Sequence, residues 1–405
     1  MRRACAFVMI LLLGVILPVN GTAFGYTADT TVPSAGGCAQ PDRWNAAGGV
    51  QINRRWSTAL PGSNVILTVA DSSESAQLAE IEQAISDSFG AWTGVTGTTV
   101  NATNYPNEFG PLNQTVTAGA CSNDNESNID GLNTICFDQP STGFTSGVLA
   151  FTRVITANAP GVSIGASATS SFAGQILDAD TLVRPDGQAI FATPQALATQ
   201  AGQGAYDLES ILTHELGHWM GLDHSAVMRA VMYPFAPPPG TYTGTRPSPD
   251  SPDAMLADDD RTGLRSQYPD PNDAVDVGTI RGALVPANPF ALATIPSPAA
   301  GMNVTGIFGG HVVAVDEDTG SVVAGTISGW SCSASGTMQF DGSFEIQRLP
   351  VGHDYVIYAE PLDGIFTPDD LSVALGGLCG ASGDSACAMP AVNTNFNGAM
   401  LTSGP

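Results

Sequence analysis

The sequence of 405 residues contains no lysine, and its thirteen basic residues are all arginine. They stand against 38 acidic residues, so the formal net charge is −25. Nucleic-acid binders gain affinity from lysine and arginine that neutralise phosphates, and this balance excludes that class of partner. A hydrophobic fraction of 43% still allows a buried core, and the length predicts two domains with additional segments.

Long apolar runs are lacking except at the start of the chain. Arg2 and Arg3 precede an apolar stretch over residues 4–19, which is followed by small residues around Gly21 and Ala23. This order predicts a secretory signal peptide over residues 1–23, with an uncleaved membrane anchor as the alternative. We therefore expect an exported, extracellular protein with no membrane span after removal of the signal. The oligomeric state is not predicted.

Cysteines are few and contain no CxxC pair, which argues against a cysteine zinc site. Loss of the signal removes Cys5 and leaves six, an even number that predicts disulfides in an exported chain. Because Cys121 and Cys136 lie in one polar insertion, we expect them to pair. Cys379 with Cys387 is a second expected pair.

Histidine is scarce as well, but three of the five lie within eleven residues. His214 and His218 are four apart, so a helix would direct both imidazoles at one ion. Gly221 can adopt the left-handed conformation that ends a helix, and the chain can then return with His224 as a third ligand. Three nitrogen ligands and a water form the open tetrahedral site of catalytic zinc. Glu215 would reach that water.

The segment from His214 to His224 matches HExxHxxGxxH and resembles the metzincin zinc signature, in its matrixin (peptidase M10) branch and bacterial style. Met232 with Tyr233 and Pro234 is similar to the Met-turn of that family, and residues 256–268 resemble the C-terminal helix of matrixins. The resemblance covers residues 51–269. It implies an exported zinc-dependent metalloendopeptidase with Glu215 as general base and Met232 as a hydrophobic floor.

The resemblance also implies how a protein or peptide substrate would bind, as an extended strand beside an edge strand. Our candidate edge is Val148–Arg153. Asp223 is either a support for a zinc ligand or a solvated carboxylate at the end of the helix. Trp219 and Met220 are expected in the core.

One catalytic zinc is the expected cofactor, because only three histidines precede residue 300 and a second histidine-built zinc site cannot form there. Calcium is a further metal that the resemblance implies. Its ligands stay unassigned because no acidic loop has EF-hand spacing. The acidic residues considered are Asp124, Glu126, Asp130, Asp178, Asp180 and Asp186.

Cys38 has two interpretations. Its surroundings loosely resemble a pro-segment in which a thiolate blocks the zinc, whereas the even number of cysteines favours a disulfide. Residues 24–50 are accordingly an N-terminal segment or a short pro-region.

The predicted fold class is α+β. Residues 51–270 should form a metzincin domain with a twisted, mostly parallel five-stranded sheet and long helices, including helices over 75–95, from Asp207, and over 258–267. A linker at 271–276 leads to a small all-β sandwich at 277–405. That domain lacks a catalytic constellation and resembles the transthyretin-like regulatory domain of carboxypeptidases. The alternative function is a non-catalytic extracellular binding or surface protein that keeps the metzincin fold.

Overall fold

The computed structural model describes the main elements of the chain with gaps between them. The described ranges are 73–100, 133–137, 146–164, 168–185, 187–199, 204–240, 255–273, 277–285, 310–329 and 341–360, with short pieces within 19–68 and at 144, 305–307, 331–333 and 338–339. Some predictions fall on residues outside these ranges. They are the signal peptide apart from Val19–Asn20, the pair Cys379 and Cys387, and the calcium candidates Asp124, Glu126, Asp130 and Asp186. None of the helices in the described ranges is long and apolar enough to cross a membrane.

A four-stranded sheet underlies the histidine segment, in the order β5 (Arg54–Trp56), β7 (Asn133–Cys136), β11 (Gln175–Val183) and β8 (Ala150–Ala157). β5, β7 and β11 run parallel, and β8 pairs antiparallel to β11. Every residue of β11 is buried, which is typical of a strand covered on both faces. Among the described strands, β8 lies at an edge of the sheet, where the candidate edge Val148–Arg153 was expected.

Five strands were predicted for the sheet, and the described residues supply four of them. A separate sheet contains β6 (Val65–Ile66), β12 (Phe191–Ala192) and β13 (Tyr206–Asp207). β6 ends early because the N–H of Thr68 donates to the Glu80 carboxylate of a helix, not to a neighbouring strand.

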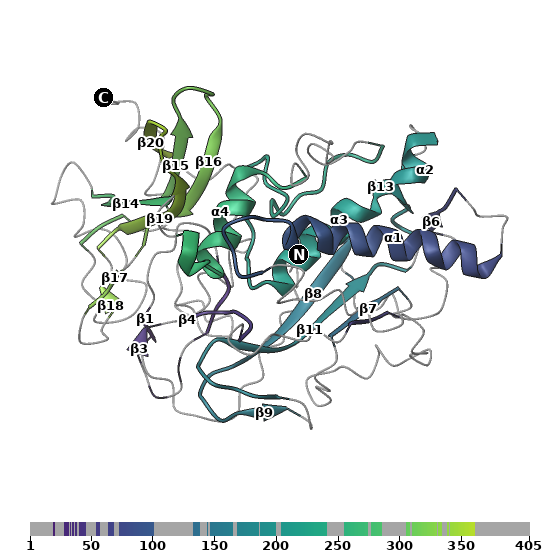
Figure 1. The fold of residues 1–405 in the computed structure, drawn as a ribbon, viewed down its shortest axis with the longest axis horizontal. Coiled ribbons are helices and arrows are strands. Elements are labelled where there is room, and N and C mark those ends of the chain that lie inside the picture. Colours follow the sequence, from purple (N-terminus) through teal and green to yellow (C-terminus); the bar gives the residue numbers. More distant parts are fainter. Residues whose placement is uncertain are drawn as a thin grey trace.

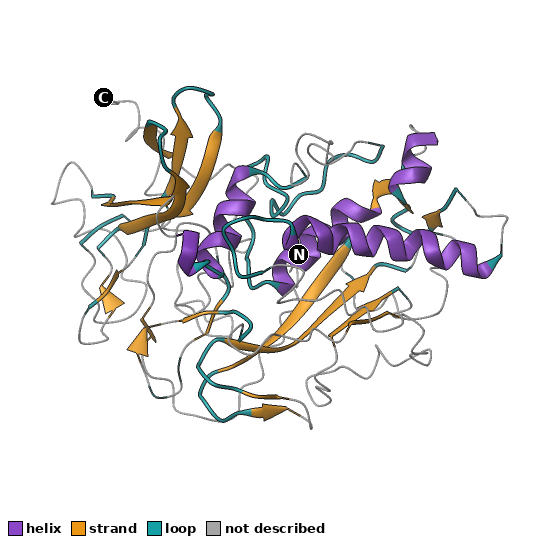
Figure 2. Ribbon diagram, viewed as in Figure 1, coloured by secondary structure: helices purple, strands orange, loops and turns teal. Residues whose placement is uncertain are grey.

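Two helices lie side by side above the sheet (Figures 1 and 2). They are α1 (Glu74–Thr93) and α3 (Leu208–Trp219), and α3 packs on both β8 and β11. The Ser73 hydroxyl caps α1 by accepting the N–H of Ala76. α2 (Pro194–Thr199) is short, and α4 (Asp258–Gln267) has the predicted bounds.

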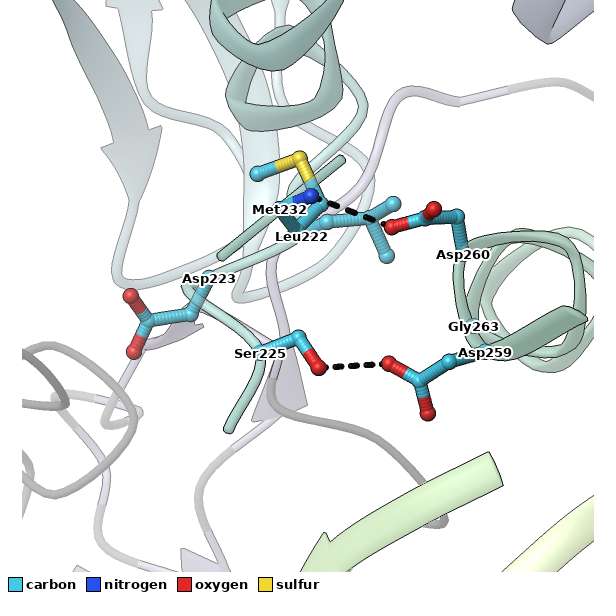
Figure 3. A pocket seen from close by; sticks show the side chains of 7 residues that line it. All are labelled: Leu222, Asp223, Ser225, Met232, Asp259, Asp260 and Gly263. Carbon is cyan, nitrogen blue, oxygen red and sulfur yellow. Dashed lines mark hydrogen bonds between the residues drawn. The ribbon is translucent and has the colours of Figure 1, made fainter. Parts of the chain in front are cut away.

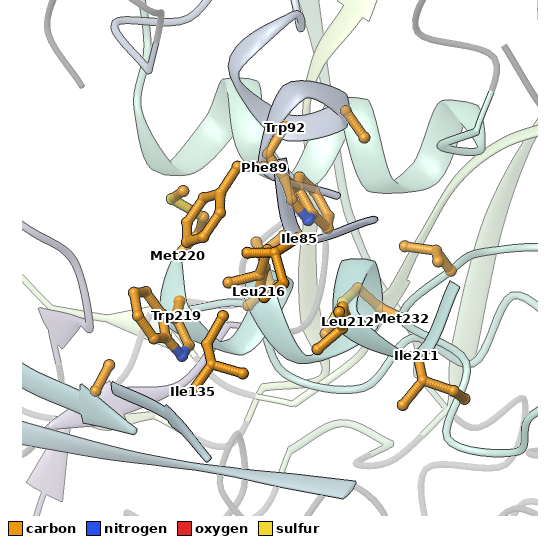
Figure 4. Close-up of a cluster of buried hydrophobic side chains, with 14 of the residues drawn as sticks. Ile85, Phe89, Trp92, Ile135, Ile211, Leu212, Leu216, Trp219, Met220 and Met232 are labelled. Carbon is orange, nitrogen blue, oxygen red and sulfur yellow. The ribbon is translucent and has the colours of Figure 1, made fainter. Parts of the chain in front are cut away.

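The main hydrophobic core fills the space between α1, α3 and the sheet (Figure 4). Phe89 and Trp219 meet edge to face, with ring centroids 5.5 Å apart. The Trp92 indole N–H donates to the carbonyl of Thr213, 2.8 Å away. Trp219 and Met220 are fully buried, which confirms that they are core residues.

The N-terminal segment is built into this half of the molecule. Asp29 donates its N–H to Gly221, and the Trp44 indole donates to the carbonyl of Trp219, 2.7 Å away. Cys38 forms a disulfide with Cys332, so it is not a free thiolate switch. The strands here are β1 (Val19–Asn20), β2 (Thr30–Thr31), β3 (Gly37–Cys38) and β4 (Gln40–Pro41).

Cys136 is also disulfide-bonded. Its expected partner Cys121 lies outside the described residues, so the predicted pairing of these two cysteines stays a prediction.

After the 3₁₀ turn Pro271–Asp273 the chain forms two antiparallel sheets around a second hydrophobic core. One pairs β14 (Val277–Ala283) with β19 (Ser343–Pro350), and the other has the order β16 (Val322–Ile327), β15 (His311–Asp316), β20 (Tyr355–Glu360). Relation to a carboxypeptidase regulatory domain stays a prediction. Two-residue strands complete the described elements: β9 (Ser163–Ile164), β10 (Ala168–Thr169), β17 (Ser331–Cys332) and β18 (Met338–Gln339).

Candidate metal centre

The end of α3 explains how the third histidine returns to the first two. Gly221 has φ +79°, its N–H donates to the carbonyl of His218, and the N–H of Leu222 donates to Gly217. This pair of bonds is the Schellman motif that closes a helix. A side chain at Gly221 would also collide with the main chain of Asp42, because its Cβ would lie 1.8 Å from that carbonyl oxygen. Glycine is therefore required both by the backbone conformation and by the N-terminal segment.

The turn brings His214, His218 and His224 together. Their ring centroids are 5.0 Å apart for His214 and His218, 5.3 Å for His214 and His224, and 5.0 Å for His218 and His224. One nitrogen from each ring lies within 4.8 Å of the other two. Three imidazoles at this separation are spaced as ligands of a single ion. His218 is buried, whereas His214 and His224 are only partly covered, so the cluster is open on one side.

Hydrogen bonds fix which nitrogen of two rings is available to a metal. His214 Nδ1 lies 2.7 Å from the carbonyl oxygen of Val231, and His218 Nδ1 lies 2.8 Å from that of Leu222. A carbonyl can only accept, so Nδ1 carries the hydrogen in both rings and Nε2 keeps its lone pair. This is the arrangement that metal-binding histidines adopt, and the residues fit a zinc ion.

Electrostatics keep these rings neutral, as metal ligation requires. Burial, with the nearby His224, lowers the pKa of His214 to about 3, although its bond to Val231 acts in the opposite direction. Burial and the two neighbouring imidazoles lower the pKa of His218 well below its ordinary value.

Glu215 is buried on the same helix, and its carboxylate is held from the sheet. The Thr152 hydroxyl on β8 donates to Oε2 over 2.7 Å. Burial raises the pKa of Glu215 to about 8, and the Thr152 hydrogen bond partly opposes this rise.

Met232 lies against the helix that carries two of the histidines. A Cβ on Gly217 would stand 2.1 Å from the Met232 sulfur, so the small residue lets the methionine pack closely. Met232 is buried, whereas Met228, the methionine between His224 and Met232, is 74% exposed. The structure thus distinguishes the two methionines in favour of the predicted one.

Two carboxylates of α4 hold the chain between His224 and Met232, as Figure 3 shows. Asp260 accepts the N–H groups of Val231 and Met232, and Asp259 accepts the hydroxyl of Ser225 over 2.6 Å. The other oxygen of Asp259 accepts the N–H of Gly325 on β16, so the C-terminal sheets contact this support. From sequence, these aspartates are only acidic residues in the first turn of a predicted helix. No spacing identified their partners.

The remaining site predictions have mixed outcomes. Asp223 is only 3% exposed and accepts the N–H of His224 over 2.7 Å. The alternative of a solvated carboxylate is therefore wrong. Asp180 is paired with Arg153 at 3.2 Å and accepts the N–H of Thr134. Asp178 is likewise buried. Neither belongs to a metal-sized cluster in the described part of the chain, and calcium ligands stay unassigned.

The segment that carries the candidate metal centre is similar to known proteins. Residues 163–269 match the matrixin family, peptidase M10. A stretch of 64 residues is 45% identical to metalloendoproteinase 1 of Glycine max and covers 16% of this chain and 17% of that protein. The match thus spans about a sixth of the relative's length. The matched residues include the three histidines, Met232 and α4, and this part of the chain is similar to the matrixin family.

Proposed function

We propose that the protein is an exported zinc-dependent endopeptidase in which His214, His218 and His224 hold the ion. The observation that carries this proposal is the convergence of three imidazoles, two of which already donate the Nδ1 hydrogen to main-chain carbonyls. Without a metal, three imidazoles this close together would not stabilise the fold. The matrixin match over residues 163–269 supports the same activity.

When bound, zinc would polarise a water and the scissile carbonyl, and its charge would favour the ionised form of the neighbouring Glu215. Glu215 then acts as general base, taking a proton from the attacking water and returning it to the leaving amine. Met232 supports the histidines from below as an apolar contact.

The substrate lies along β8 in this proposal. β8 presents an edge among the described strands, so its free main-chain groups are available to an extended peptide. The same strand carries Thr152, which contacts Glu215. In this proposal, β8 contacts both the bound peptide and the general base.

Export is part of the proposal. Its support is the predicted signal at residues 1–23 together with the disulfide between Cys38 and Cys332, a bond that persists in oxidising compartments.

The experiment is Glu215→Gln, which keeps the shape of the side chain and removes the base. Peptide cleavage should fall by at least about 100-fold, the usual contribution of a general base, while one equivalent of zinc stays bound. Zinc is measured by elemental analysis and cleavage with a peptide library, with and without a chelator. Cleavage that persists in the variant would contradict the role of Glu215. A wild-type protein that binds zinc and cleaves nothing would favour the non-catalytic alternative.

A further inference from the structure

Four buried side chains form a continuous line of hydrogen bonds that ends on Glu215. The Trp219 indole N–H donates to Thr181 Oγ1 over 2.7 Å, and Thr181 Oγ1 lies 2.8 Å from Thr152 Oγ1. Thr152 Oγ1 in turn lies 2.7 Å from Glu215 Oε2. None of the four is more than 4% exposed, so water does not compete for these bonds.

The direction of each bond follows from the chemistry of the groups. An indole N–H only donates, so Thr181 accepts from Trp219. Thr152 donates its single hydrogen to Glu215, so the bond between the two threonines must run from Thr181 to Thr152. The main-chain oxygen of Glu215 is also near, at 3.1 Å, but Oε2 is closer and becomes charged. All three hydrogens are used once and no donor faces another donor.

Rigid elements hold both ends of this line. Thr152 and Thr181 are direct partners in the antiparallel pairing of β8 with β11. Glu215 and Trp219 are four residues apart on α3 and so share one face of the helix. The line begins and ends on the same helix and passes through two strands of the sheet.

One of the two carboxylate oxygens of Glu215 is available to contact a water molecule. Oε2 is taken by Thr152, whereas Oε1 accepts no hydrogen bond from the described residues. The carboxylate therefore has a held oxygen and a free one, and rotation about its last torsion would break the bond to Thr152.

We propose that Thr152 is a positioning residue for Glu215, with Thr181 and Trp219 orienting its hydroxyl, so that Oε1 is presented to the attacking water. This inference rests on the proposed function. It assigns to the strand expected to bind the substrate a second task, which is to fix the general base. A threonine at position 152 supplies both the strand geometry and the hydrogen.

The test compares Thr152→Val with Thr152→Ser in the zinc-loaded full chain. Valine keeps the shape and removes the hydroxyl, whereas serine restores the hydroxyl and removes a methyl group. We expect kcat to fall about 10-fold in Thr152→Val, with KM and zinc content within about 2-fold of wild type. Thr152→Ser should keep kcat within about 2-fold. Thr181→Val, which leaves the donor to Glu215 in place, should lie between the two.

Several outcomes would overturn the inference. Equal losses in the valine and serine variants would indicate packing alone, and a change confined to KM would indicate substrate binding alone. Should Thr152→Val fail to fold, Thr152→Ala also lacks the hydroxyl and adds no bulk, so it serves the same comparison. If wild type is active, Glu215→Gln is inactive and Thr152→Val matches wild type, the positioning role fails while the endopeptidase stands. A wild type with no cleavage refutes the proposed function itself.

Discussion

The two halves of the molecule use histidine in opposite ways. Around α3, three imidazoles face one another, and burial together with neighbouring imidazoles lowers the pKa of His214 and of His218. In the C-terminal half, His353 faces Asp316 at 2.7 Å and His311 faces Glu360 at 3.0 Å. The first arrangement brings together groups that repel when charged, whereas the second pairs acid with base.

That difference separates the candidate metal centre from a structural contact. Asp316, Asp318 and His353 also lie within metal-binding distance of one another. Both oxygens of Asp316 already have partners, since Oδ1 accepts the N–H groups of Asp318 and Thr319 and Oδ2 pairs with His353. Those main-chain bonds, from Thr319 above all, lower the pKa of Asp316. A cluster of ligand atoms therefore indicates a metal site only where those atoms are not already engaged by other hydrogen-bonding partners.

The sharpest way to break this comparison is to remove one histidine from each half. His218→Ala should lose its zinc and reduce peptide cleavage by more than about 100-fold, the upper range for loss of an outer partner of a ligand. His353→Ala should keep one equivalent of zinc, because it only ends a surface pair. Elemental analysis of the purified variants decides. Two equivalents in wild type, one of them lost in His353→Ala, would contradict the distinction.

Carboxylates extend the comparison to stability. Asp260 is buried and accepts three main-chain N–H groups, from Val231, Met232 and Ala257. Asp260→Ala leaves these donors without a partner, so we expect the free energy of unfolding to fall by about 3–5 kcal/mol. The matched control is Asp258→Ala, two residues earlier on the same helix, which removes only a partly exposed pair with Arg261.

For that control we expect a loss of about 0–1 kcal/mol, as for other surface ion pairs. Denaturant titration of zinc-loaded protein measures both variants. Equal losses would mean that the three N–H groups find other partners and that Asp260 does not anchor the Met-turn.

Whether a site residue could be predicted from the sequence depends on how far along the chain its interaction partner lies. His214, His218 and Gly221 are linked by helix periodicity and a helix end, both local rules, and the structure has them as expected. α4 was equally local. Asp260 and Thr152 act across 28 and 63 residues, and nothing in the local pattern relates them to Met232 or Glu215.

The disulfide gives the same lesson at the largest separation. Cys38 and Cys332 are 294 residues apart, and their pairing depends on how the N-terminal segment meets the C-terminal sheets. Parity favoured a disulfide for Cys38 without identifying its partner. The shortened strand β6 has a related cause, because a carboxylate on α1 takes the hydrogen bond that a longer strand would use. Tertiary contacts of this kind have no sequence period.

The last comparison concerns pH, because carboxylates in the two halves shift in opposite directions. Burial raises the pKa of Asp42 to about 8, whereas the bond from His311 lowers the pKa of Glu360. Between about pH 4 and pH 8 the folded protein keeps a proton on Asp42 that the unfolded chain has lost. The contribution of Asp42 to the free energy of unfolding therefore falls as pH rises, by about 1.4 kcal/mol per pH unit. Asp42→Asn cannot titrate, so its unfolding free energy should decline less steeply from pH 5 to pH 7.

Glu360→Gln is the control from the other half. A lowered pKa contributes stability that is present above the ordinary value of a glutamate and is lost as pH falls below it. Between pH 5 and pH 7 this variant should therefore keep the slope of wild type, and differences should appear only in more acidic solution. Denaturant titrations of zinc-loaded protein at pH 5, 6 and 7 measure the slopes. If Asp42→Asn and wild type decline in parallel, the folded protein holds Asp42 ionised, and a cation or solvent must reach a carboxylate that is only 5% exposed. In that case burial of charge would not distinguish the half with the metal centre from the half without it.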